Sequence, residues 1–416
     1  MEKFFKPRSV ALVGASSKKG KIGYEIFKNV IKSKVKAYPV NPNRKKIFGK
    51  KCYKSLDEIK DRIDLAVIAV DADKCIEELE KCGKKGIENI VIISGGFKEI
   101  GKIEAEKKIV ELGRKYKMRI IGPNCIGVFN SENGFNTFFQ RNMDLPKKGN
   151  VAIMTQSGTF GIALLEKCAT EGIGVTKFVS YGNKADVNEV DLLKYFKNDK
   201  KTDIIAIYAE EIGKDFFEIK NEKIVIVLKS GRSDLGQKAA FLHTGAMASN
   251  YKIFEGACKQ RNIIFADDFE EFFGVLKILA MRGLPSGGKV AIVTNGAGPG
   301  VMACDFAGGA RNIEIAEIVD LTGSATARDF IEAVEKRRED IIVLTFVFQD
   351  SPLAESLKEL YYGLKKSGKY FIAICMGGRF VEEQKKNLLK LKIPVFEEPR
   401  IAINSIDKIV SYSLRK

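Results

Sequence analysis

The stretch VAIMTQSGTFG, residues 151–161, joins an apolar run of strand length to a turn of small residues that can open a helix. A similar stretch, VAIVTNGAGPG, occupies residues 290–300. Strand, glycine-rich turn and helix in this order are typical of βα units, in which the free backbone N–H groups at the helix start can meet an anion. Glycine at such turns can equally serve tight backbone geometry alone. The two matches suggest related folds, although two short matches do not establish a repeat.

Outward from these stretches, short apolar runs alternate with amphipathic segments along the chain. Further strands are expected at residues 10–13, 35–40, 65–70, 90–93, 119–121, 175–180, 203–208, 224–228, 263–266, 341–348 and 370–376. This alternation predicts an α/β protein with parallel, doubly wound sheets covered by helices on both faces. We predict three domains: a Rossmann-like domain at 1–145, a flavodoxin-like domain at 146–286 and a second flavodoxin-like domain at 287–416. A Pro-Ser-Gly-Gly linker at 285–288 separates the last two.

Composition narrows the class of function. The 416 residues carry a formal charge of +17, but lysines alternate with acidic residues along the chain, and no nucleic-acid-binding motif is present. Nucleic acid is therefore disfavoured as a partner, and phosphorylated small molecules fit the charge equally well. No apolar run approaches the roughly 20 residues of a membrane span, and we expect no signal peptide. The eight cysteines are scattered without a CxxC pair, which favours reduced thiols, a cytoplasmic location and no metal site.

The first glycine loop, VGASSKKGKIG at 13–23, does not have the GxGxxG spacing of a dinucleotide fingerprint. The second expected strand ends in VNPN at 40–43, without the acidic residue that would hold a nicotinamide ribose. An NAD-dependent dehydrogenase is therefore disfavoured. A nucleotide with a diphosphate could still lie over the helix start, and the basic residues 44–46 could either meet an additional phosphate or be plain surface.

The only histidine of the chain, His243, lies in KSGRSDLGQKAAFLHTGAMASN at 229–250, a stretch without clear apolar period. Long segments of this kind inside an α/β pattern are usually functional loops or disordered. Histidine can act as a nucleophile, a base or a metal ligand, and a lone histidine cannot build a histidine-rich metal site. An unselected histidine is more often structural, so the other motifs must decide its role.

Four motifs in order, VGAS at 13–16, NPN at 41–43, SGGF at 94–97 and GPNCIG at 122–127, resemble the CoA-binding domain of succinyl-CoA synthetases and their nucleoside-diphosphate-forming relatives. The resemblance implies coenzyme A at the carboxyl ends of the strands, with its diphosphate near the first motif. The implied CoA-binding residues are Gly14, Ala15, Ser16, Asn41, Pro42, Asn43, Ser94, Gly95, Gly96, Phe97, Asn124 and Cys125. For Cys125 we favour a small buried residue beside the site over thiol chemistry.

Three further motifs, TQSGTFG at 155–161, SYGNKADVNEVDLLKYF at 180–196 and HTGAMAS at 243–249, resemble the second domain of the same family. The resemblance implies that His243 is the phosphorylated nucleophile and that Glu210 orients it, with the adjacent Glu211 as the less favoured carboxylate. The implied phosphate-binding residues are Ser157, Gly158, Gly182, Asn183, Thr244 and Gly245.

The implied chemistry agrees with the residue types. A neutral imidazole can attack an acyl phosphate when a carboxylate holds its other nitrogen and helix-start N–H groups meet the phosphoryl oxygens. Asp186, in contrast, has a structural explanation, because Asp-Val-Asn-Glu fits a capping box with Glu189. Asp186 and Asp191 are therefore left out of the catalytic set.

Beyond residue 287, TNGAGPGVMACDFA at 294–307, VDLTGSATARDF at 319–330, FQDSPLA at 348–354 and PVFEEPRIAINSI at 394–406 resemble the third domain of the α subunit of ADP-forming acetyl-CoA synthetases. The connection between the first two motifs is short for the family, which leaves the local fold open. The resemblance implies a ligase subunit that converts acyl-CoA, phosphate and ADP to acid, CoA and ATP through an acyl phosphate and a phosphohistidine.

The three units occupy the whole chain, so an ATP-grasp unit must lie elsewhere. The resemblance implies a separate β subunit that carries ADP or ATP with magnesium, in an α2β2-type hetero-oligomer. Two alternatives remain: the α subunit of a succinyl-CoA ligase, disfavoured by the third unit, and a non-catalytic CoA-binding regulatory protein, disfavoured by the histidine loop. The sequence indicates neither the preferred acid nor ADP against GDP.

Overall fold

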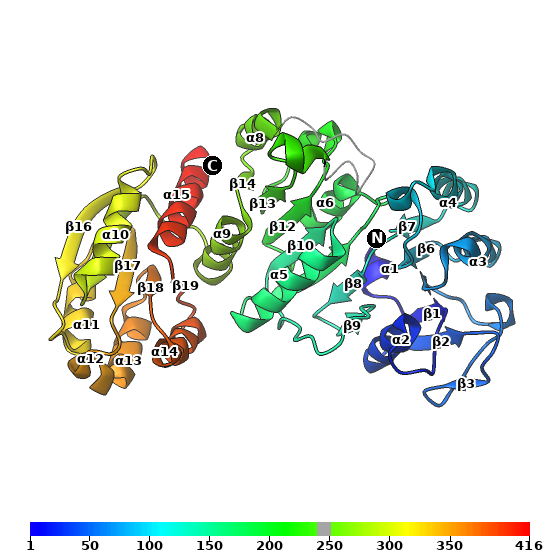
Figure 1. Cartoon of the computed structure of the whole chain (residues 1–416), viewed down its shortest axis with the longest axis horizontal. Helices are drawn as coiled ribbons and strands as arrows, with labels where there is room; N and C mark the ends of the chain where they lie inside the picture. Colours follow the sequence, from blue (N-terminus) through cyan, green and yellow to red (C-terminus); the bar gives the residue numbers. More distant parts are fainter. Residues whose placement is uncertain (239–250) are drawn as a thin grey trace. The chain divides into compact units, whose positions relative to one another are not determined.

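The computed structural model describes residues 1–238 and 251–416, which form two compact units (Figure 1). The first unit comprises Met1–Thr170 and Gly174–Ala257, and the second comprises Glu171–Ile173 and Cys258–Lys416. Nearly every expected strand is present within two residues of its expected bounds. The α/β prediction is therefore confirmed, whereas the division into three domains stays a prediction.

The first unit begins with a parallel sheet of order β2-β1-β5-β6-β7. Its strands are β1 (Ser9–Val13), β2 (Lys36–Val40), β5 (Leu65–Ile68), β6 (Asn89–Ile92) and β7 (Arg119–Ile121). The connecting helices are α2 (Ile22–Lys32), α3 (Ala72–Lys84) and α4 (Ile103–Lys115), and a short helix, α1 (Glu2–Phe5), precedes β1. Every residue of β1, β5 and β6 is buried, as expected for parallel strands covered on both faces. A small hairpin of β3 (Lys46–Ile47) and β4 (Lys50–Lys51) was not predicted.

The strands of the second sheet that belong to this unit have the order β13-β12-β10-β11-β8-β9. Its parallel strands are β10 (Val151–Thr155), β11 (Val175–Ser180), β12 (Ile204–Ala209) and β13 (Ile224–Lys229), with helices α5 (Gly158–Thr170) and α6 (Glu189–Lys197). At one edge β8 (Gly127–Asn130) runs antiparallel to β11 and pairs with β9 (Phe135–Asn136). These two strands lie inside the range 1–145 that we assigned to the first domain, so the chain enters the second sheet earlier than the sequence indicated.

An ion-paired clamp joins elements of the two sheets within the first unit. Asp186, just before α6, accepts hydrogen bonds from Arg119 Nε at 3.0 Å and from the backbone N–H of Ile120 at 2.7 Å, both in β7. The cap of α6 is instead Asn188, which forms a capping box with Asp191. The predicted capping role of Asp186 is therefore wrong, because a tertiary partner outcompetes the local pattern.

The second unit contains a parallel sheet of order β16-β15-β17-β18-β19. Its strands are β15 (Lys289–Thr294), β16 (Glu314–Asp320), β17 (Ile341–Phe346), β18 (Phe371–Cys375) and β19 (Val395–Phe396), preceded in sequence by β14 (Ile264–Ala266). Its helices are α9 (Phe269–Arg282), α10 (Ala297–Ala307), α11 (Ala327–Glu335), α12 (Ser351–Glu355), α13 (Leu357–Ser367), α14 (Arg379–Lys390) and α15 (Pro399–Arg415), and α8 (Tyr251–Gln260) lies where the two units divide. The short connection after Ala307 still leads into an edge strand, β16, most of whose residues are exposed.

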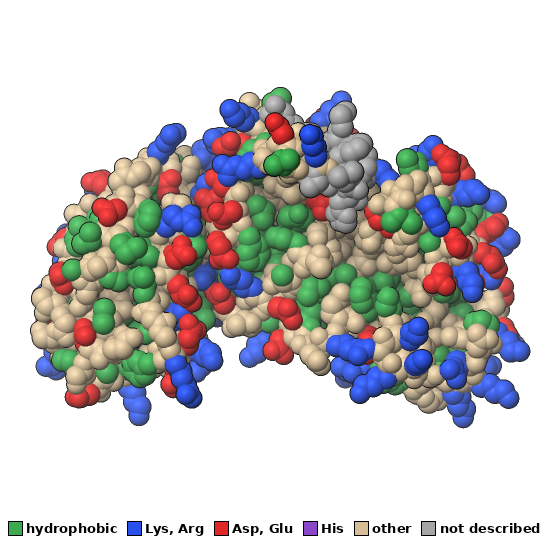
Figure 2. Space-filling model, in the orientation of Figure 1, with side chains coloured by type: hydrophobic (Ala, Val, Ile, Leu, Met, Phe, Trp, Pro, Cys, Tyr) green, Lys and Arg blue, Asp and Glu red, His purple; other side chains and the backbone are tan. Residues whose placement is uncertain are grey.

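The surface agrees with the charge pattern of the sequence. Figure 2 shows Lys and Arg side chains interspersed with Asp and Glu over the visible face of each unit. Among the residues that the structure describes, helices are either too short or too polar to cross a membrane.

Candidate functional site

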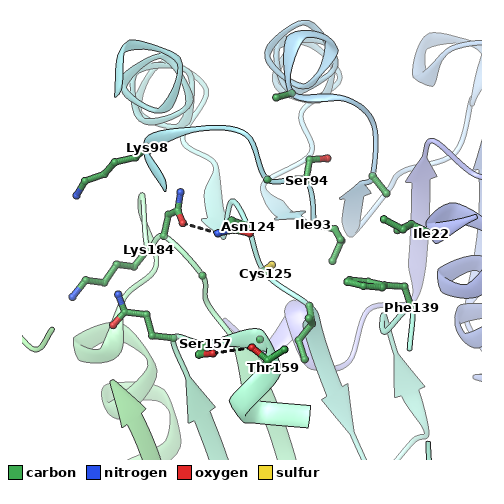
Figure 3. Close-up of a pocket in the computed structure, with 18 of the residues that line it drawn as sticks. Ile22, Ile93, Ser94, Lys98, Asn124, Cys125, Phe139, Ser157, Thr159 and Lys184 are labelled. Carbon is green, nitrogen blue, oxygen red and sulfur yellow. Dashed lines mark hydrogen bonds between the residues drawn. The ribbon is translucent and has the colours of Figure 1, made fainter. Parts of the chain in front are cut away.

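A cavity of about 620 Å³ lies in the first unit, at the carboxyl ends of strands from both of its sheets (Figure 3). Its walls come from the loops that follow β5, β6, β7, β10, β11 and β12. Ligands of doubly wound folds bind at this end of the sheet. The cavity is therefore where the sequence motifs of the first two predicted domains meet.

The two ends of the cavity differ in character. The lining includes the apolar side chains of Ile22, Ile93, Ile126 and Phe139 and the polar side chains of Lys98, Asn124, Ser157, Asn183 and Lys184. In Figure 3 Ile22 and Phe139 lie on the opposite side from Lys98 and Lys184. Such a cavity suits a ligand that has an apolar arm and an anionic reacting end.

The VGAS and NPN motifs come together beside the first sheet. Gly14 has φ +91°, and a Cβ there would lie 2.2 Å from the carbonyl oxygen of Ala69. Asn41 Nδ2 donates a hydrogen bond to the carbonyl oxygen of Ala15 at 2.7 Å. The structure thus places Gly14, Ala15 and Asn41 in one cluster, although these residues do not line the cavity itself.

The SGGF and GPNCIG motifs form part of the cavity wall. The backbone N–H of Asn124 donates to the carbonyl oxygen of Ser94 at 2.8 Å, and both residues line the cavity with Gly95 and Cys125. Phe97, in contrast, is fully buried in the core. Cys125 is 4% exposed, and burial raises the pKa of its thiol to about 12. A thiol with so high a pKa is a poor nucleophile, which agrees with a packing role.

On the opposite wall, Ser157 and Gly158 lie at the start of α5, and Gly182 and Asn183 follow β11. Ser157 Oγ accepts a hydrogen bond from the backbone N–H of Phe160 at 3.4 Å, as a helix N-cap does. The four predicted phosphate-binding residues that the structure describes therefore share one cavity. His243, Thr244 and Gly245 lie outside the described residues.

Glu210 follows the last residue of β12 and also lines the cavity, although its side chain is only 7% exposed. Gln156 Oε1 accepts hydrogen bonds from the backbone N–H groups of Glu210 and Glu211, at 3.0 and 3.3 Å. This buried glutamine fixes the end of β12 against the start of α5. Sequence reasoning missed Gln156, although its place inside TQSG, at the end of a buried strand, was a signal.

Lys184 is a second site residue that the sequence did not reveal. Its ammonium donates to both carboxylate oxygens of Glu189 at 3.2 Å and to the carbonyl oxygen of Glu211 at 3.0 Å. The Glu211 carboxylate lies 3.7 Å from the same ammonium. The choice of Glu210 over Glu211 as the carboxylate that orients the histidine stays a prediction.

The polar wall continues into a network of buried and partly buried carboxylates and amides. Asn183 Nδ2 donates to Glu99 Oε2 at 2.6 Å and to Glu106 Oε2 at 2.8 Å. Burial alone would raise the pKa of Glu99, but hydrogen bonds from Asn183, Gly96 and Phe97 outweigh it and lower the pKa. For Glu106 burial dominates, and its pKa is raised.

Two family models match the first unit and the segment that follows it. Residues 8–131 match the model described as a CoA binding domain, and residues 148–279 match the model described as a succinyl-CoA ligase like flavodoxin domain. The matched ranges contain the motifs that surround the cavity.

Full-length relatives extend the likeness to the third predicted domain. The α subunit of acetate–CoA ligase [ADP-forming] I of Pyrococcus furiosus is 38% identical, over 99% of this chain and 98% of the relative. The α subunit of form II from the same organism is 35% identical, over 96% of this chain and 95% of the relative. The chain belongs to the family of ADP-forming acetate–CoA ligase α subunits.

The fold agrees with this membership of the ADP-forming acetate–CoA ligase family. A solved structure of acetyl-coenzyme A synthetase 1 from Ca. Korarchaeum cryptofilum, in complex with phosphate and ADP, superposes with a TM-score of 0.89. It is 32% identical and covers 99% of this chain and 97% of its own. The family resemblance that we predicted from the motifs, including those of the third predicted domain, is thus confirmed.

Proposed function

We propose that this chain is the catalytic α subunit of an ADP-forming acyl-CoA synthetase, with acetyl-CoA as the first substrate to test. The net reaction is acyl-CoA, phosphate and ADP to free acid, CoA and ATP, and it is reversible. One observation carries the proposal: a single cavity joins the loops of the SGGF and GPNCIG motifs to the start of α5 and to Glu210. A CoA-binding protein without turnover would not need the second set of residues.

The reaction divides into three balanced steps. Phosphate attacks the thioester carbonyl, the C–S bond breaks, and acyl phosphate and CoA thiolate result. An imidazole nitrogen of His243 then attacks the phosphorus, and the carboxylate of the acid leaves. Phosphohistidine finally transfers its phosphoryl group to ADP, which regenerates the imidazole and yields ATP.

The residues of the cavity have distinct parts in this scheme. The Glu210 carboxylate accepts the N–H of the His243 ring, which fixes the tautomer and stabilises positive charge on the ring. Ser157 and Gly158 at the start of α5, with Gly182 and Asn183, surround the phosphoryl oxygens, where free N–H groups favour an anion. The apolar wall with Ile22 and its neighbours receives the pantetheine arm.

The proposed reaction requires a second chain. The relatives are named as α subunits, which supports a separate β subunit. We assign to that subunit an ATP-grasp fold that holds ADP or ATP with magnesium, and we assign an α2β2-type assembly to the pair. The scattered cysteines of the sequence, without a CxxC pair, support a reducing, cytoplasmic location.

The test is a reconstitution of this chain with its β subunit. CoA release from acetyl-CoA is followed with a thiol reagent, with phosphate and ADP present together or singly. CoA release that requires both phosphate and ADP supports the proposal. The same assay with succinyl-CoA in place of acetyl-CoA distinguishes the succinyl-CoA ligase alternative. Tight CoA binding without any CoA release would instead assign the chain to the regulatory class.

A further inference from the structure

Three loops of the first unit meet behind the polar wall of the cavity, and Glu99 lies at their centre. Its Oε1 accepts hydrogen bonds from the backbone N–H groups of Gly96 and Phe97, at 2.5 and 3.2 Å. Its Oε2 accepts the hydrogen bond from Asn183 Nδ2 at 2.6 Å. One carboxylate therefore holds the loop after β6 with one oxygen and the loop after β11 with the other.

The third loop joins this arrangement through Asn183. Its Oδ1 accepts a hydrogen bond from Asn124 Nδ2 at 3.2 Å, which Figure 3 marks with a dashed line, and its backbone N–H donates to the carbonyl oxygen of Pro123 at 2.9 Å. Asn124 and Asn183 both line the cavity, one from the CoA motifs and one from the phosphate motifs. The two halves of the proposed site are thus connected by hydrogen bonds that end on Glu99.

The backbone at this crossing leaves little freedom. Asn124, Gly182 and Lys184 all have positive φ, at +58°, +53° and +50°. Non-glycine residues adopt this region only where the surroundings fix them. A displacement of one loop must therefore move the other or break the network.

We propose that Glu99 is a positioning residue that couples coenzyme A binding to phosphate binding in this cavity. The inference rests on the proposed function, because that function assigns CoA and phosphate to the two sides. When coenzyme A orders the loops that contain Asn124 and Gly96, the hydrogen bonds also order Asn183. Phosphate then binds to a loop that is already fixed. Binding of either ligand then strengthens binding of the other, by the same factor in both directions.

Glu99 and Glu106 differ in a way that makes substitution informative. Both oxygens of Glu99 accept hydrogen bonds, so the amide of E99Q must present an N–H to a donor on one side. In Glu106 only Oε2 accepts, from Asn183 and from the Lys98 backbone N–H, and the carbonyl oxygen of a glutamine can take its place. E99Q should break the link, and E106Q should keep it.

The experiment is calorimetric titration of the full chain with CoA, without and with saturating inorganic phosphate. No acyl group is present, so no turnover occurs. We expect phosphate to tighten CoA binding about fivefold or more in the wild-type chain and in E106Q, and less than twofold in E99Q. The control for net charge is Glu104→Gln, which removes the charge of an exposed side chain on α4, the helix that also carries Glu106. This variant should show the same tightening of CoA binding by phosphate as the wild-type chain.

Glu99→Asp extends the test if E99Q folds poorly. The shorter side chain keeps the charge but cannot reach both loops, so the bridging role predicts loss of the coupling factor. Retained coupling in E99D or E99Q, or no effect of phosphate on the wild-type chain, would overturn the inference. Failure of CoA release in the reconstituted pair would contradict the proposed function but would not affect these binding factors, so the two failures are distinguishable.

Discussion

Gly182 provides a sharp test of how closely the loops of the cavity are packed. Its backbone has φ +53°, and a Cβ there would lie 2.2 Å from the carbonyl oxygen of Pro123 and 2.3 Å from that of Asn124. Both obstacles are backbone atoms, which cannot rotate away as a flexible side chain would. Gly182→Ala must therefore separate the loop after β11 from the loop after β7.

The expected loss of stability in Gly182→Ala has two contributions. Left-handed backbone costs a non-glycine residue about 1–2 kcal/mol, and overpacking costs typically about 1–3 kcal/mol more. Gly86→Ala measures the backbone contribution alone. Gly86 also has a positive φ, +74°, but no atom of the described residues lies within 4 Å of its added Cβ. We expect Gly182→Ala to destabilise the first unit by about 1–3 kcal/mol more than Gly86→Ala, which corresponds to roughly 2–12 °C in Tm for a unit of this size.

Differential scanning calorimetry measures both variants. The transition that CoA shifts upward reports the first unit, because a ligand stabilises only the part that binds it. We also expect the CoA-induced shift to shrink in Gly182→Ala and to persist in Gly86→Ala. Equal destabilisation of the two variants, with equal response to CoA, would refute the close crossing of these loops.

Three further predictions follow from buried groups. Because burial raises the pKa of Glu106, the folded chain favours its protonated form, and wild-type stability falls as pH rises through that pKa. The unfolding free energy of E106Q should therefore exceed that of the wild type by more at pH 8 than at pH 5. Lys177, 1% exposed, pairs with the partly buried Asp199 at 2.5 Å, so Lys177→Met should cost about 1–3 kcal/mol by removing the charged partner of that carboxylate. Iodoacetamide should label the half-buried Cys304 well before Cys125, whose pKa burial raises to about 12.

Each of these has a control or an outcome that would contradict it. For the pH prediction, a constant offset of E106Q from the wild type at both pH values would contradict the raised pKa of Glu106. For the ion pair, Lys36→Met breaks the exposed pair with Asp61 and should cost much less stability than Lys177→Met. For the thiols, mass spectrometry of the labelled peptides decides the order, and early labelling of Cys125 would contradict its burial.

The alternation of apolar runs was enough to predict most strands of the sheets, because nearly all residues of these runs are buried. Of the four short CoA motifs, SGGF and GPNCIG lie in the wall of the cavity, whereas VGAS and NPN cluster beside the first sheet. Gly14 shows why such a motif is visible in the sequence: its left-handed backbone and the contact with the end of β5 admit no side chain, so the position requires glycine.

Other parts of the site depend on contacts that no local pattern encodes. Glu99 and Asn183 are far apart in sequence, and their hydrogen bond exists only because β6 and β11 end at the same cavity. The antiparallel β8 escaped prediction because its four residues, GVFN, make only a short apolar run directly after the GPNCIG motif. Asp186 was misassigned since a local capping rule ignores Arg119, which arrives from another strand.

The central claim is that this chain carries a phosphoryl group on His243. The direct measurement incubates the chain and its β subunit with acetyl-CoA and labelled phosphate, then follows label on the separated α chain. We predict one acid-labile, alkali-stable label per chain that ADP removes and that His243→Ala abolishes while CoA binding persists. An unlabelled wild-type chain, or label that survives in His243→Ala, would contradict the account.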